Sequence, residues 1–380
     1  MTYLFWLSVL VLAYTYFGYP LYLFLRMRIF VNGVMKDMSY RPGVSIIISA
    51  CNEEVYIEEK LNNLLRSDYP AEKMEILIGS DGSQDGTNKI LSRIADKRVR
   101  VFIFEARRGK PSVLNDIVPE ANGEILIFCD VRQPFDTNAL SHLTANFSDE
   151  RVGCVSGELV FERSPSVNGV SNGVNMYWNY EKSMRRGESA IHSMVGATGA
   201  IYAIKRKLYA PPPQDTILDD VYIPLAIARQ GYRCIWDEEA KAYDKPAFTP
   251  DAEYRRKVRT LAGNYQIFGM FRDLLIPFRN PISAPLISHK LLRVLAPFFM
   301  ITLFLSNLFI AKASYYAFFM TCQAMFYILA ILGSLTYDRR GKRLITKAAS
   351  VAYMFCLMNF TAIVGLYRFL TGRQKIAWEK

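Results

Sequence analysis

Two long stretches without a charged side chain place the strongest limit on how this 380-residue chain can fold. Residues Thr2 to Leu25 are uncharged and rich in Leu, Tyr, Phe and Val, and residues Ser314 to Tyr337 carry no charge either. About 20 apolar residues in a helix cross the core of a bilayer, so each stretch is long enough to span one. A signal peptide is the alternative for the first stretch, but its apolar run is too long and it lacks a basic n-region. The sequence therefore predicts a transmembrane helix at residues 1–28.

Two further apolar stretches carry one basic residue each, Leu291–Ile310 and Ala348–Leu370. Together with the uncharged stretch between them, they predict about three transmembrane helices within residues 291–371. The chain is thus expected to be an integral membrane protein, and the cell (inner) membrane is the expected location.

Basic residues set the expected orientation of these helices. Arg26 and Arg28 follow the first uncharged stretch directly, and under the positive-inside rule they place the next domain in the cytoplasm. The basic loop at residues 338–347 is expected on the same side. The number of predicted transmembrane helices then places the basic tail, residues 372–380, outside the cytoplasm. The positive-inside rule disfavours basic residues on that side. The side of the C-terminus therefore stays open, as does the alternative that one segment is re-entrant.

Between the apolar stretches, residues 42–266 are predicted to form one large cytoplasmic domain. Runs of β-branched and aliphatic residues predict four buried strands, at Val44–Ser49, Ile76–Ile78, Val99–Phe104 and Glu124–Cys129. Segments compatible with helices separate these strands along the chain. Strands that alternate with helices predict an α/β fold with a mostly parallel, doubly wound sheet.

Acidic side chains follow three of these strands, and a ligand site is expected there. Glu53 comes after the first strand, Asp81 lies in the Gly-, Asp- and Ser-rich turn after the second, and Asp130 caps the fourth. Right-handed crossovers bring the carboxyl ends of parallel strands to one edge of the sheet, where open α/β sheets bind ligands. An ordinary strand, turn and helix with an Asp cap is the plain alternative at each position taken alone.

Composition and cysteine spacing disfavour several classes of protein. The net charge of +11 is best explained by residues that face anionic lipid, because no nucleic-acid-binding motif accompanies it. None of the six cysteines forms a Cys-x-x-Cys pair, so reduced thiols are expected, and the three histidines offer no histidine metal cluster. A dinucleotide-binding oxidoreductase is disfavoured because no Gly-x-Gly-x-x-Gly follows a strand.

Five short motifs follow one another through the predicted domain: Ala50-Cys51-Asn52-Glu53-Glu54, Ser80-Asp81-Gly82-Ser83-Gln84-Asp85-Gly86-Thr87, Gly109-Lys110 with Leu114-Asn115, Cys129-Asp130, and Leu218-Asp219-Asp220. Their order and spacing resemble those of the inverting family-two glycosyltransferases, which have a GT-A fold and use nucleotide-diphosphate sugars. The membrane flanks are similar to those of the branch that includes cellulose, chitin and hyaluronan synthases. The resemblance covers about residues 42–270.

The resemblance assigns a nucleotide-sugar site to the carboxyl edge of the sheet. A nucleotide base and ribose need a polar rim, to which the family pattern assigns Ala50, Asn52, Glu53 and Asp81. Lys110 falls where the family has a basic residue near the nucleotide, although a solvated loop lysine is the plain alternative.

The same resemblance implies a metal ion, Mg²⁺ or Mn²⁺, held by Asp130. This residue occupies the first position of the family's Asp-x-Asp motif, and carboxylate and diphosphate oxygens suit such ions. Arg132 stands at the second position, so this sequence departs from the pattern. Metal dependence is still expected, because the diphosphate supplies most of the ligands. Arg132 is alternatively able to contact phosphate itself.

Asp220 is the candidate general base, with Asp219 as its neighbour in the catalytic pair. Inverting transfer needs a carboxylate that takes the proton of the attacking hydroxyl, and the family places it last in an acidic pair that opens a helix. Asp219 is expected to raise the pKa of its neighbour by like-charge repulsion. The plain alternative is that both carboxylates only cap the helix.

The acceptor side carries a small-residue segment and a basic segment. Gly196, Thr198 and Gly199 resemble the residues that line the acceptor in the family. Arg259 matches the arginine of the synthase motif Gln-x-x-Arg-Trp and is expected to face the leaving diphosphate, whereas Arg256 and Thr260 replace the Gln and the Trp. The missing Trp removes a stacking surface for the terminal sugar of the acceptor, and this argues against processive polymer synthesis.

Residues 267–290 mix aromatic and basic residues and are predicted to form amphipathic helices at the membrane interface. The preferred function is a membrane-bound inverting hexosyltransferase that uses a UDP-sugar and extends a polysaccharide or a lipid-linked acceptor at the cytoplasmic face. Non-processive transfer to polyprenyl phosphate or another lipid is the alternative, and a degenerate membrane scaffold is a further one. The sequence leaves the sugar, the linkage and the need for a partner subunit open.

Overall fold

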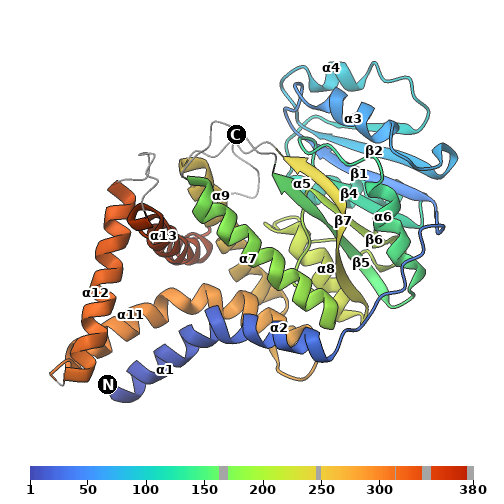
Figure 1. Ribbon diagram of the computed structural model, residues 1–380. Coiled ribbons are helices and arrows are strands. Elements are labelled where there is room, and N and C mark those ends of the chain that lie inside the picture. Colours follow the sequence, from blue (N-terminus) through green and yellow to red (C-terminus); the bar gives the residue numbers. More distant parts are fainter. Residues whose placement is uncertain (162–169, 245–249, 313, 336–343, 375–380) are drawn as a thin grey trace.

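An α/β domain and a group of long helices lie side by side in this chain (Figure 1). The structure is a computed structural model that describes residues 1–161, 170–244, 250–312, 314–335 and 344–374. The basic loop predicted at 338–347 and the basic tail predicted at 372–380 lie largely outside these residues.

The α/β domain is built on a seven-stranded sheet with the order β3-β2-β1-β4-β6-β5-β7. The strands are β1 (Val44–Ala50), β2 (Met74–Asp81), β3 (Val99–Phe104), β4 (Ile125–Cys129), β5 (Val152–Phe161), β6 (Ile201–Lys205) and β7 (Arg233–Asp244). The first four strands pair in parallel, β6 runs antiparallel to β4 and β5, and β7 is parallel to β5. The predicted α/β fold with a mostly parallel sheet is therefore confirmed.

Helices cover both faces of the sheet, which explains why its central strands are apolar runs. Leu77 of β2 faces a core shared with Val113 and with Ile223, whereas its neighbour Ile76 faces the other core with Leu61. The covering helices are α3 (Ile57–Leu65), α4 (Thr87–Leu91), α5 (Lys110–Ile117), α6 (Ala139–Ala145) and α8 (Asp219–Arg229). β2 continues beyond the apolar run predicted at Ile76–Ile78, because its last residues still pair with β1 and β3. Asp81 therefore ends a strand rather than lying in a turn.

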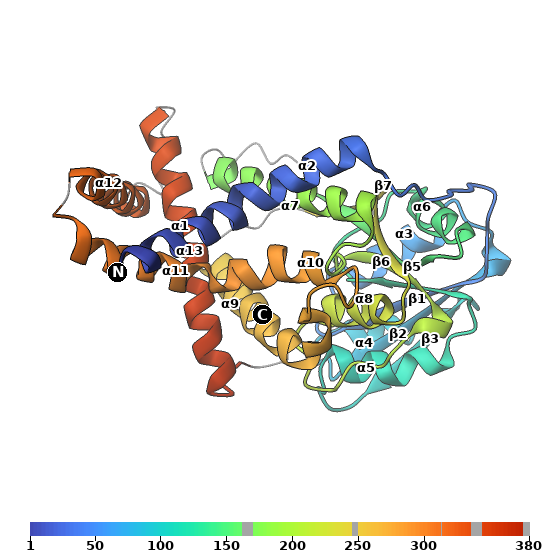
Figure 2. The same cartoon turned by 90° about the horizontal axis from the view of Figure 1, so that it is seen from below.

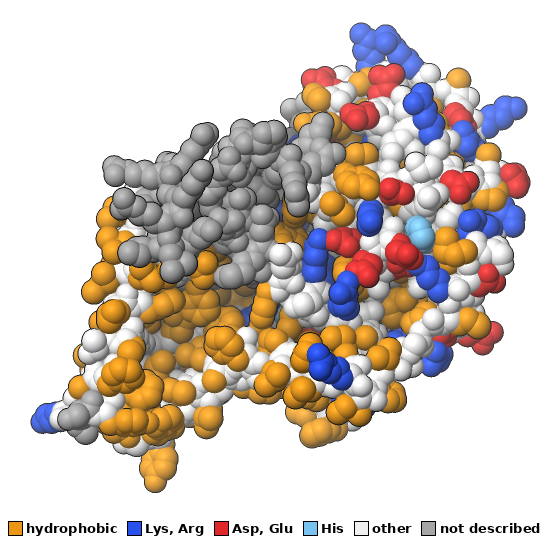
Figure 3. Space-filling model, in the orientation of Figure 1, with side chains coloured by type: hydrophobic (Ala, Val, Ile, Leu, Met, Phe, Trp, Pro, Cys, Tyr) orange, Lys and Arg blue, Asp and Glu red, His pale blue; other side chains and the backbone are white. Residues whose placement is uncertain are grey.

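Four helices are long and apolar enough to cross a membrane among the described residues: Thr2–Ile29, Ser283–Ile310, Tyr315–Leu335 and Ala348–Leu370. The first contains α1 (Thr2–Ala13), a wider turn at Tyr14–Gly18 and α2 (Tyr19–Ile29). The second contains α10 (Ser283–Pro285), the turn Leu286–Leu291 and α11 (Leu292–Ile310). The third and fourth lie within α12 (Ser314–Leu335) and α13 (Leu344–Leu370). Figure 2 shows the first helix running alongside α11, and Figure 3 shows hydrophobic side chains over these helices and charged ones over the α/β domain.

Two helices join the domain to this apolar group. α7 (Val170–Ile191) contacts β7 on one side and α2 and α13 on the other. α9 (Pro250–Met270) packs against α13 and runs through residue 266, where the sequence predicts the domain to end. A short turn at Arg272–Leu275 follows it, and the candidate span that begins at Ser283 starts inside the segment predicted as interface helices.

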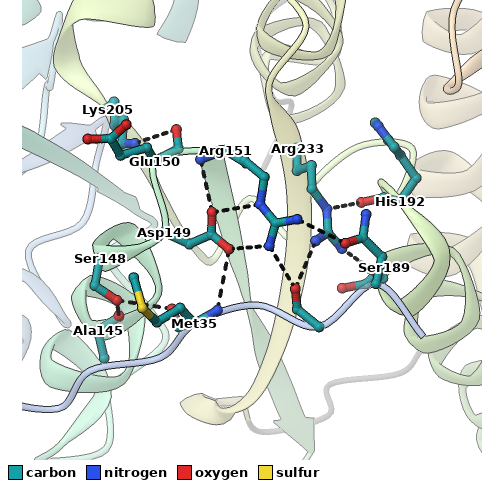
Figure 4. Close-up of polar contacts among 12 residues, drawn as sticks. Met35, Ala145, Ser148, Asp149, Glu150, Arg151, Ser189, His192, Lys205 and Arg233 are labelled. Carbon is teal, nitrogen blue, oxygen red and sulfur yellow. Dashed lines mark hydrogen bonds and ion pairs between the residues drawn. The ribbon is translucent and has the colours of Figure 1, made fainter.

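The segment after α2 is held against the domain by a polar network (Figure 4). The backbone N–H of Met35 donates to Asp149 at 3.3 Å, and Arg151 donates to the carbonyl of Gly33 at 3.0 Å. Arg233, at the start of β7, donates to the carbonyl of Ser189 in α7 at 2.9 Å. The end of α7 is therefore fixed both to the sheet and to the chain that leaves the first apolar helix.

Candidate active site

Charged side chains from three elements meet at the carboxyl edge of the sheet. Lys110 is the first residue of α5, Asp130 follows β4 directly, and Asp219 opens α8. The ammonium Nζ of Lys110 lies 3.1 Å from Oδ1 of Asp130 and 3.3 Å from Oδ2 of Asp219. The structure thus brings together three residues that the sequence places up to 109 positions apart, with their charges in direct contact.

Asp219 and Asp220 form the acidic end of this cluster. Asp219 is 6% exposed, and its Oδ2 has no hydrogen-bond partner of good geometry among the described residues. Burial and then the charge of Asp219 raise the pKa of Asp220 to about 6, against the opposing effects of Lys110 and Arg259. A carboxylate with this pKa is a stronger proton acceptor than an ordinary aspartate and is still ionised at neutral pH.

Lys110 stays charged in this setting. Burial alone would lower its pKa, but the carboxylates of Asp130, Asp219 and Asp220 outweigh burial and raise it above the usual value. The ammonium is therefore held between carboxylates rather than in solvent, as a fixed positive charge in the cluster.

Arg259 reaches the cluster from α9. Its Nη2 donates to the carbonyl of Ile217 at 2.9 Å, and the backbone N–H of Ile217 donates to Oε1 of Gln266, also in α9, at 2.9 Å. α9 packs closely on this loop, since a Cβ on Gly263 would lie 2.5 Å from the side chain of Leu218. The loop that leads into α8 is thereby fixed to α9, and Arg259 is placed within electrostatic reach of Asp220.

The predicted acceptor-lining segment lies directly against the acidic pair. The backbone N–H of Ala197 donates to the carbonyl of Asp220 at 2.7 Å. A Cβ added to Gly199 would lie 3.1 Å from Oδ2 of Asp220, so a larger residue would press on that carboxylate. Gly196 has a φ of +82°, a conformation that favours glycine. The segment thus holds a tight turn whose backbone contacts the candidate base.

Thr198 connects this turn to its surroundings through both its polar groups. Its backbone N–H donates to Oγ of Ser156 at 2.9 Å, and its hydroxyl accepts from Nη1 of Arg185 at 2.6 Å. Arg185 belongs to α7, so the acceptor-side turn is connected to the helix that faces the apolar group.

The four residues predicted for the base and ribose lie along the neighbouring strand ends. Ala50 ends β1 and is 1% exposed. Asn52 has a φ of +54°, and its Oδ1 accepts from the backbone N–H of Gln84 at 2.8 Å. The backbone N–H of Glu53 donates to Oγ1 of Thr87 at 2.8 Å. Asn52 and Glu53 therefore join the loop after β1 to the loop after β2.

Asp81 uses both carboxylate oxygens within the protein. They accept the backbone N–H groups of Arg108 at 2.7 Å and Gly109 at 2.8 Å. The carboxylate is 3% exposed and holds the loop that leads into Lys110. In this structure its role is to fix that loop, which the residue pattern alone does not show.

Arg132 pairs with a carboxylate of the same edge. Its Nε lies 3.2 Å from Oε2 of Glu53, and its guanidinium lies 5.5 Å from the centre of the Tyr56 ring. The alternative in which Arg132 contacts phosphate therefore requires this ion pair to open.

The residues present suit a metal ion that receives most of its ligands from a substrate. No group of three or more His, Cys, Asp or Glu side chains gathers as a cation site in the part of the chain that the structure describes. The side chain of Asp130 is 45% exposed and offers hard carboxylate oxygens, which Mg²⁺ and Mn²⁺ prefer. The donor set at this position thus fits such an ion beside a diphosphate.

Sequence interpretation missed Lys60, which supports the loop after Asp130. Its Nζ donates to the carbonyl of Gln133 at 2.5 Å and lies 3.9 Å from the centre of the Phe135 ring. A signal was available, because Lys60 lies between Ile57 and Leu61 on the buried stripe of α3.

The mostly parallel seven-stranded sheet and this cluster at its carboxyl edge are typical of a glycosyltransferase with a GT-A fold. The sequence matches the profile of Glycosyl transferase family 2 over residues 45–209 and that of Glycosyl transferase family group 2 over residues 134–332. The chain belongs to glycosyl transferase family 2, as the motifs predict.

Curated relatives and a solved structure agree with this family. Poly-beta-1,6-N-acetyl-D-glucosamine synthase from Staphylococcus aureus (strain COL) is 23% identical over 236 residues, which are 61% of this chain and 56% of that protein. Probable glycosyltransferase YdaM from Bacillus subtilis (strain 168) is 23% identical over 246 residues, which are 61% of this chain and 57% of that protein. The match thus spans little more than half the length of these relatives.

The mannosyltransferase PcManGT from Pyrobaculum calidifontis, solved in complex with GDP-Man and Mn²⁺, superimposes with a TM-score of 0.73. It is 22% identical, and the match covers 97% of this chain and 99% of that one. This likeness shows that the two chains share a fold, including the helices beside the domain.

Proposed function

We propose that this protein is a membrane-bound inverting glycosyltransferase that moves a hexosyl group from a nucleotide-diphosphate sugar, a UDP-sugar in the first instance, to a glycan or lipid-linked acceptor. The observation that carries the proposal is the position of Asp220. Its carboxylate, with a pKa raised to about 6, lies between the acceptor-side turn and the cationic group of Lys110 and Arg259.

The chain's own residues divide the transfer between them. Asp220 takes the proton of the acceptor hydroxyl as its oxygen attacks the anomeric carbon of the donor. The bond from that carbon to the diphosphate oxygen breaks, and the diphosphate leaves with the electron pair. Attack from the opposite side inverts the anomeric centre. Lys110 and Arg259 stabilise the charge that grows on the leaving diphosphate.

Asp219 acts on the reaction through its neighbours. It pairs with Lys110 at 3.3 Å and is the second cause, after burial, of the raised pKa of Asp220. Asp219 is therefore a positioning residue, whose loss should move the pH profile rather than remove the proton acceptor.

Asp130 is the residue that would hold Mg²⁺ or Mn²⁺. The ion supplies positive charge that offsets the charge of the diphosphate. The structure of PcManGT with GDP-Man and Mn²⁺ has the same fold and supports this proposal.

The donor base and ribose are proposed to lie over Ala50, Asn52 and Glu53. Asp81 contributes by fixing the backbone of Arg108 and Gly109, which form the neighbouring wall. A rim built from backbone held in this way is pre-organised, because its hydrogen bonds form before the donor arrives.

The catalytic domain is proposed to lie on the cytoplasmic face of the cell membrane. Arg26 and Arg28 lie in the last turn of α2, at the domain end of the first apolar helix. Positive charge at this end supports a cytoplasmic domain under the positive-inside rule.

The test is nucleotide release by the full chain purified in detergent, across UDP- and GDP-sugars, with Mn²⁺, Mg²⁺ or EDTA. The proposal expects turnover of one donor that EDTA abolishes and that Asp220→Asn lowers by about 10²–10⁴-fold. No turnover of any donor, with and without a lipid extract, would favour a membrane scaffold. Turnover at the wild-type rate in Asp220→Asn would show that another group is the base.

Product size separates single transfer to a lipid from polymer synthesis. Arg256 and Thr260, at the positions of the Gln and Trp of the synthase motif, favour single transfer to polyprenyl phosphate or another lipid as the second candidate. A ladder of products from one donor would exclude that candidate, and a product with one added sugar would support it.

A further inference from the structure

A groove lies between α7 and the strands β5 and β7, beside the candidate active site. It consists of two hollows that share Glu158, Lys182 and Trp236. The inner hollow is narrow, about 10 Å³, and the outer one opens to about 230 Å³. Figure 1 shows α7 crossing beside these strands on the side that faces the apolar helices.

Two tryptophans give the groove aromatic surface. Trp178 lines the inner hollow and contacts the ring of Phe161 edge-on, with 5.2 Å between ring centres. Trp236 lines both hollows and has the guanidinium of Arg186 5.6 Å from its ring centre. Indole rings combine a flat apolar face with a polar edge, which suits the alternating apolar and hydroxyl faces of a sugar ring.

Polar atoms without partners point to a ligand in the inner hollow. Nε1 of Trp178 and Nε of Arg185 are buried and have no hydrogen-bond partner among the described residues. Buried donors without acceptors are costly, so a ligand oxygen or a water that reaches them is favoured.

Positive and negative side chains are equal in number in the groove, and this balance favours a neutral ligand over a phosphate. Three carboxylates and three cations line the two hollows: Glu158, Glu181, Glu238, Lys182, Arg185 and Arg186. Lys182 pairs with Glu158, and Arg186 pairs with Glu238. A phosphate would have to compete with these carboxylates for the cations. Neutral hydroxyl groups can instead donate to the carboxylates and accept from the cations without separating the pairs.

The groove leads to the candidate base. Thr198 lines the inner hollow, and its hydroxyl accepts from Arg185 at 2.6 Å. The next residue, Gly199, approaches the carboxylate of Asp220 so closely that a Cβ there would lie 3.1 Å from Oδ2. A ligand in the groove therefore lies next to the acceptor-side turn.

We propose that this groove binds neutral sugar rings of a glycan acceptor, behind the ring that reacts at Asp220. Trp236 offers the stacking surface in the outer hollow, and Trp178 and Arg185 hold hydroxyl groups in the inner one. The tryptophans thus replace the stacking surface that Thr260 lacks. The inference rests on the proposed function and names its acceptor as a sugar chain rather than a bare lipid phosphate.

The test measures binding without a donor, so that it does not depend on catalysis. Oligosaccharides of four glucose or four N-acetylglucosamine units are titrated into the full chain in detergent while tryptophan fluorescence is recorded. Two of the chain's four tryptophans line the groove, so saturable quenching by one oligosaccharide is expected. Trp236→Ala should weaken binding about tenfold, and Trp178→Phe, which keeps the ring and removes the N–H, about fivefold.

Two further variants guard against misfolding. Ser183→Trp obstructs the outer hollow from an exposed position and should abolish binding, whereas Trp6→Phe in the first apolar helix should leave it unchanged. Asp220→Asn should still bind the oligosaccharide, because binding is measured without a donor. Saturable binding by a wild-type chain that turns over no donor would support the groove while the proposed function fails.

Three outcomes would overturn the groove and leave the proposed function standing. The first is donor turnover by a chain that binds neither oligosaccharide. The second is binding that Trp236→Ala, Trp178→Phe and Ser183→Trp all leave unchanged. The third is a short polyprenyl phosphate that quenches the same tryptophans, with quenching lost in Ser183→Trp, because a lipid phosphate would then be the occupant.

Discussion

Two acidic pairs in this chain, one partly buried and one fully buried, have opposite surroundings. In the candidate active site, Asp219 and Asp220 lie next to each other, and Lys110 is shared between Asp219 and Asp130. Burial and mutual repulsion dominate there, so the pKa of Asp220 is raised to about 6.

The second pair, Glu181 and Glu188 of α7, lies where α7 meets the apolar helices. His289 is fully buried between them, with Nε2 3.0 Å from Glu181 and Nδ1 2.8 Å from Glu188, and Arg293 lies 2.8 Å from Glu181. Burial alone would raise the pKa of Glu181, but His289, Lys290 and Arg293 outweigh burial and hold it well below its usual range.

The difference separates a reactive site from a structural one. Glu181 has enough positive partners to stay ionised, and both glutamates contact His289, which connects α7 to the apolar helix that carries it. Asp220 has too few, so its pKa is raised and its carboxylate is available to accept a proton. The comparison predicts that the aspartates matter for rate and the glutamates for stability.

The largest expected effect is the loss of activity in Asp220→Asn. Without the carboxylate that accepts the hydroxyl proton, kcat should fall by about 10²–10⁴-fold. Asp215→Asn is the matched control, because it removes an exposed carboxylate from the same loop and should retain activity. Initial rates of nucleotide release measure both, and equal rates in the two variants would remove Asp220 from the mechanism.

Glu181→Gln should destabilise the protein strongly. It leaves His289, Lys290 and Arg293 without their shared carboxylate, and the loss of one member of a buried ion pair costs about 3 kcal/mol. Thermal unfolding in detergent measures the effect. Glu120→Gln is the control, because it removes a partner of Arg100 whose side chain is 53% exposed. Its free energy of unfolding should change by less than about 0.5 kcal/mol. Equal stability of the two variants would contradict a structural role for the glutamate cluster.

Lys110→Met should move the pH dependence of the remaining activity. Lys110 lowers the pKa of Asp220, so its loss should raise that pKa by about one pH unit. A base works when it is deprotonated, and the rising limb of kcat/KM should therefore shift to higher pH. An unchanged limb, or a shift to lower pH, would show that Lys110 does not act on the base.

The smallest expected effect is a gain in stability in Asp220→Asn. The pKa of Asp220 is higher in the folded state than its ordinary 3.8, so the ionised carboxylate opposes folding above about pH 6. Removal of this charge should stabilise the protein by on the order of 1 kcal/mol at pH 7.5, after discounting for partial exposure. The gain should disappear as the pH falls from 6 to 4, and melting temperatures across that window measure it. A loss of stability at pH 7.5 would contradict the account.

The sequence predicts the parallel half of the sheet and the position of Asp130, because Asp130 follows an apolar strand whose end must meet the others at one edge. Lys110 and Asp220 were identified through a family resemblance, and the structure places both near Asp130. The antiparallel strand β6 was not predicted, since its pairing with β4 and β5 depends on contacts far along the chain.

Local sequence patterns could not predict the groove. Trp178 lies on a helix and Trp236 on a strand, and their approach depends on how α7 packs across β7. The role of Asp81 was equally hidden, because nothing in its own motif shows that it binds the backbone of Arg108 and Gly109. The burial of Lys60 could have been predicted, because this residue lies on the apolar stripe of α3.

The most direct test of the central claim is the pH profile of kcat/KM for the wild-type chain between pH 4.5 and 8.5. If Asp220 is the base, activity should rise through a single deprotonation with an apparent pKa near 6 and then stay level. A profile that is flat between pH 5 and 7, or one whose rising limb survives in the residual activity of Asp220→Asn, would contradict it.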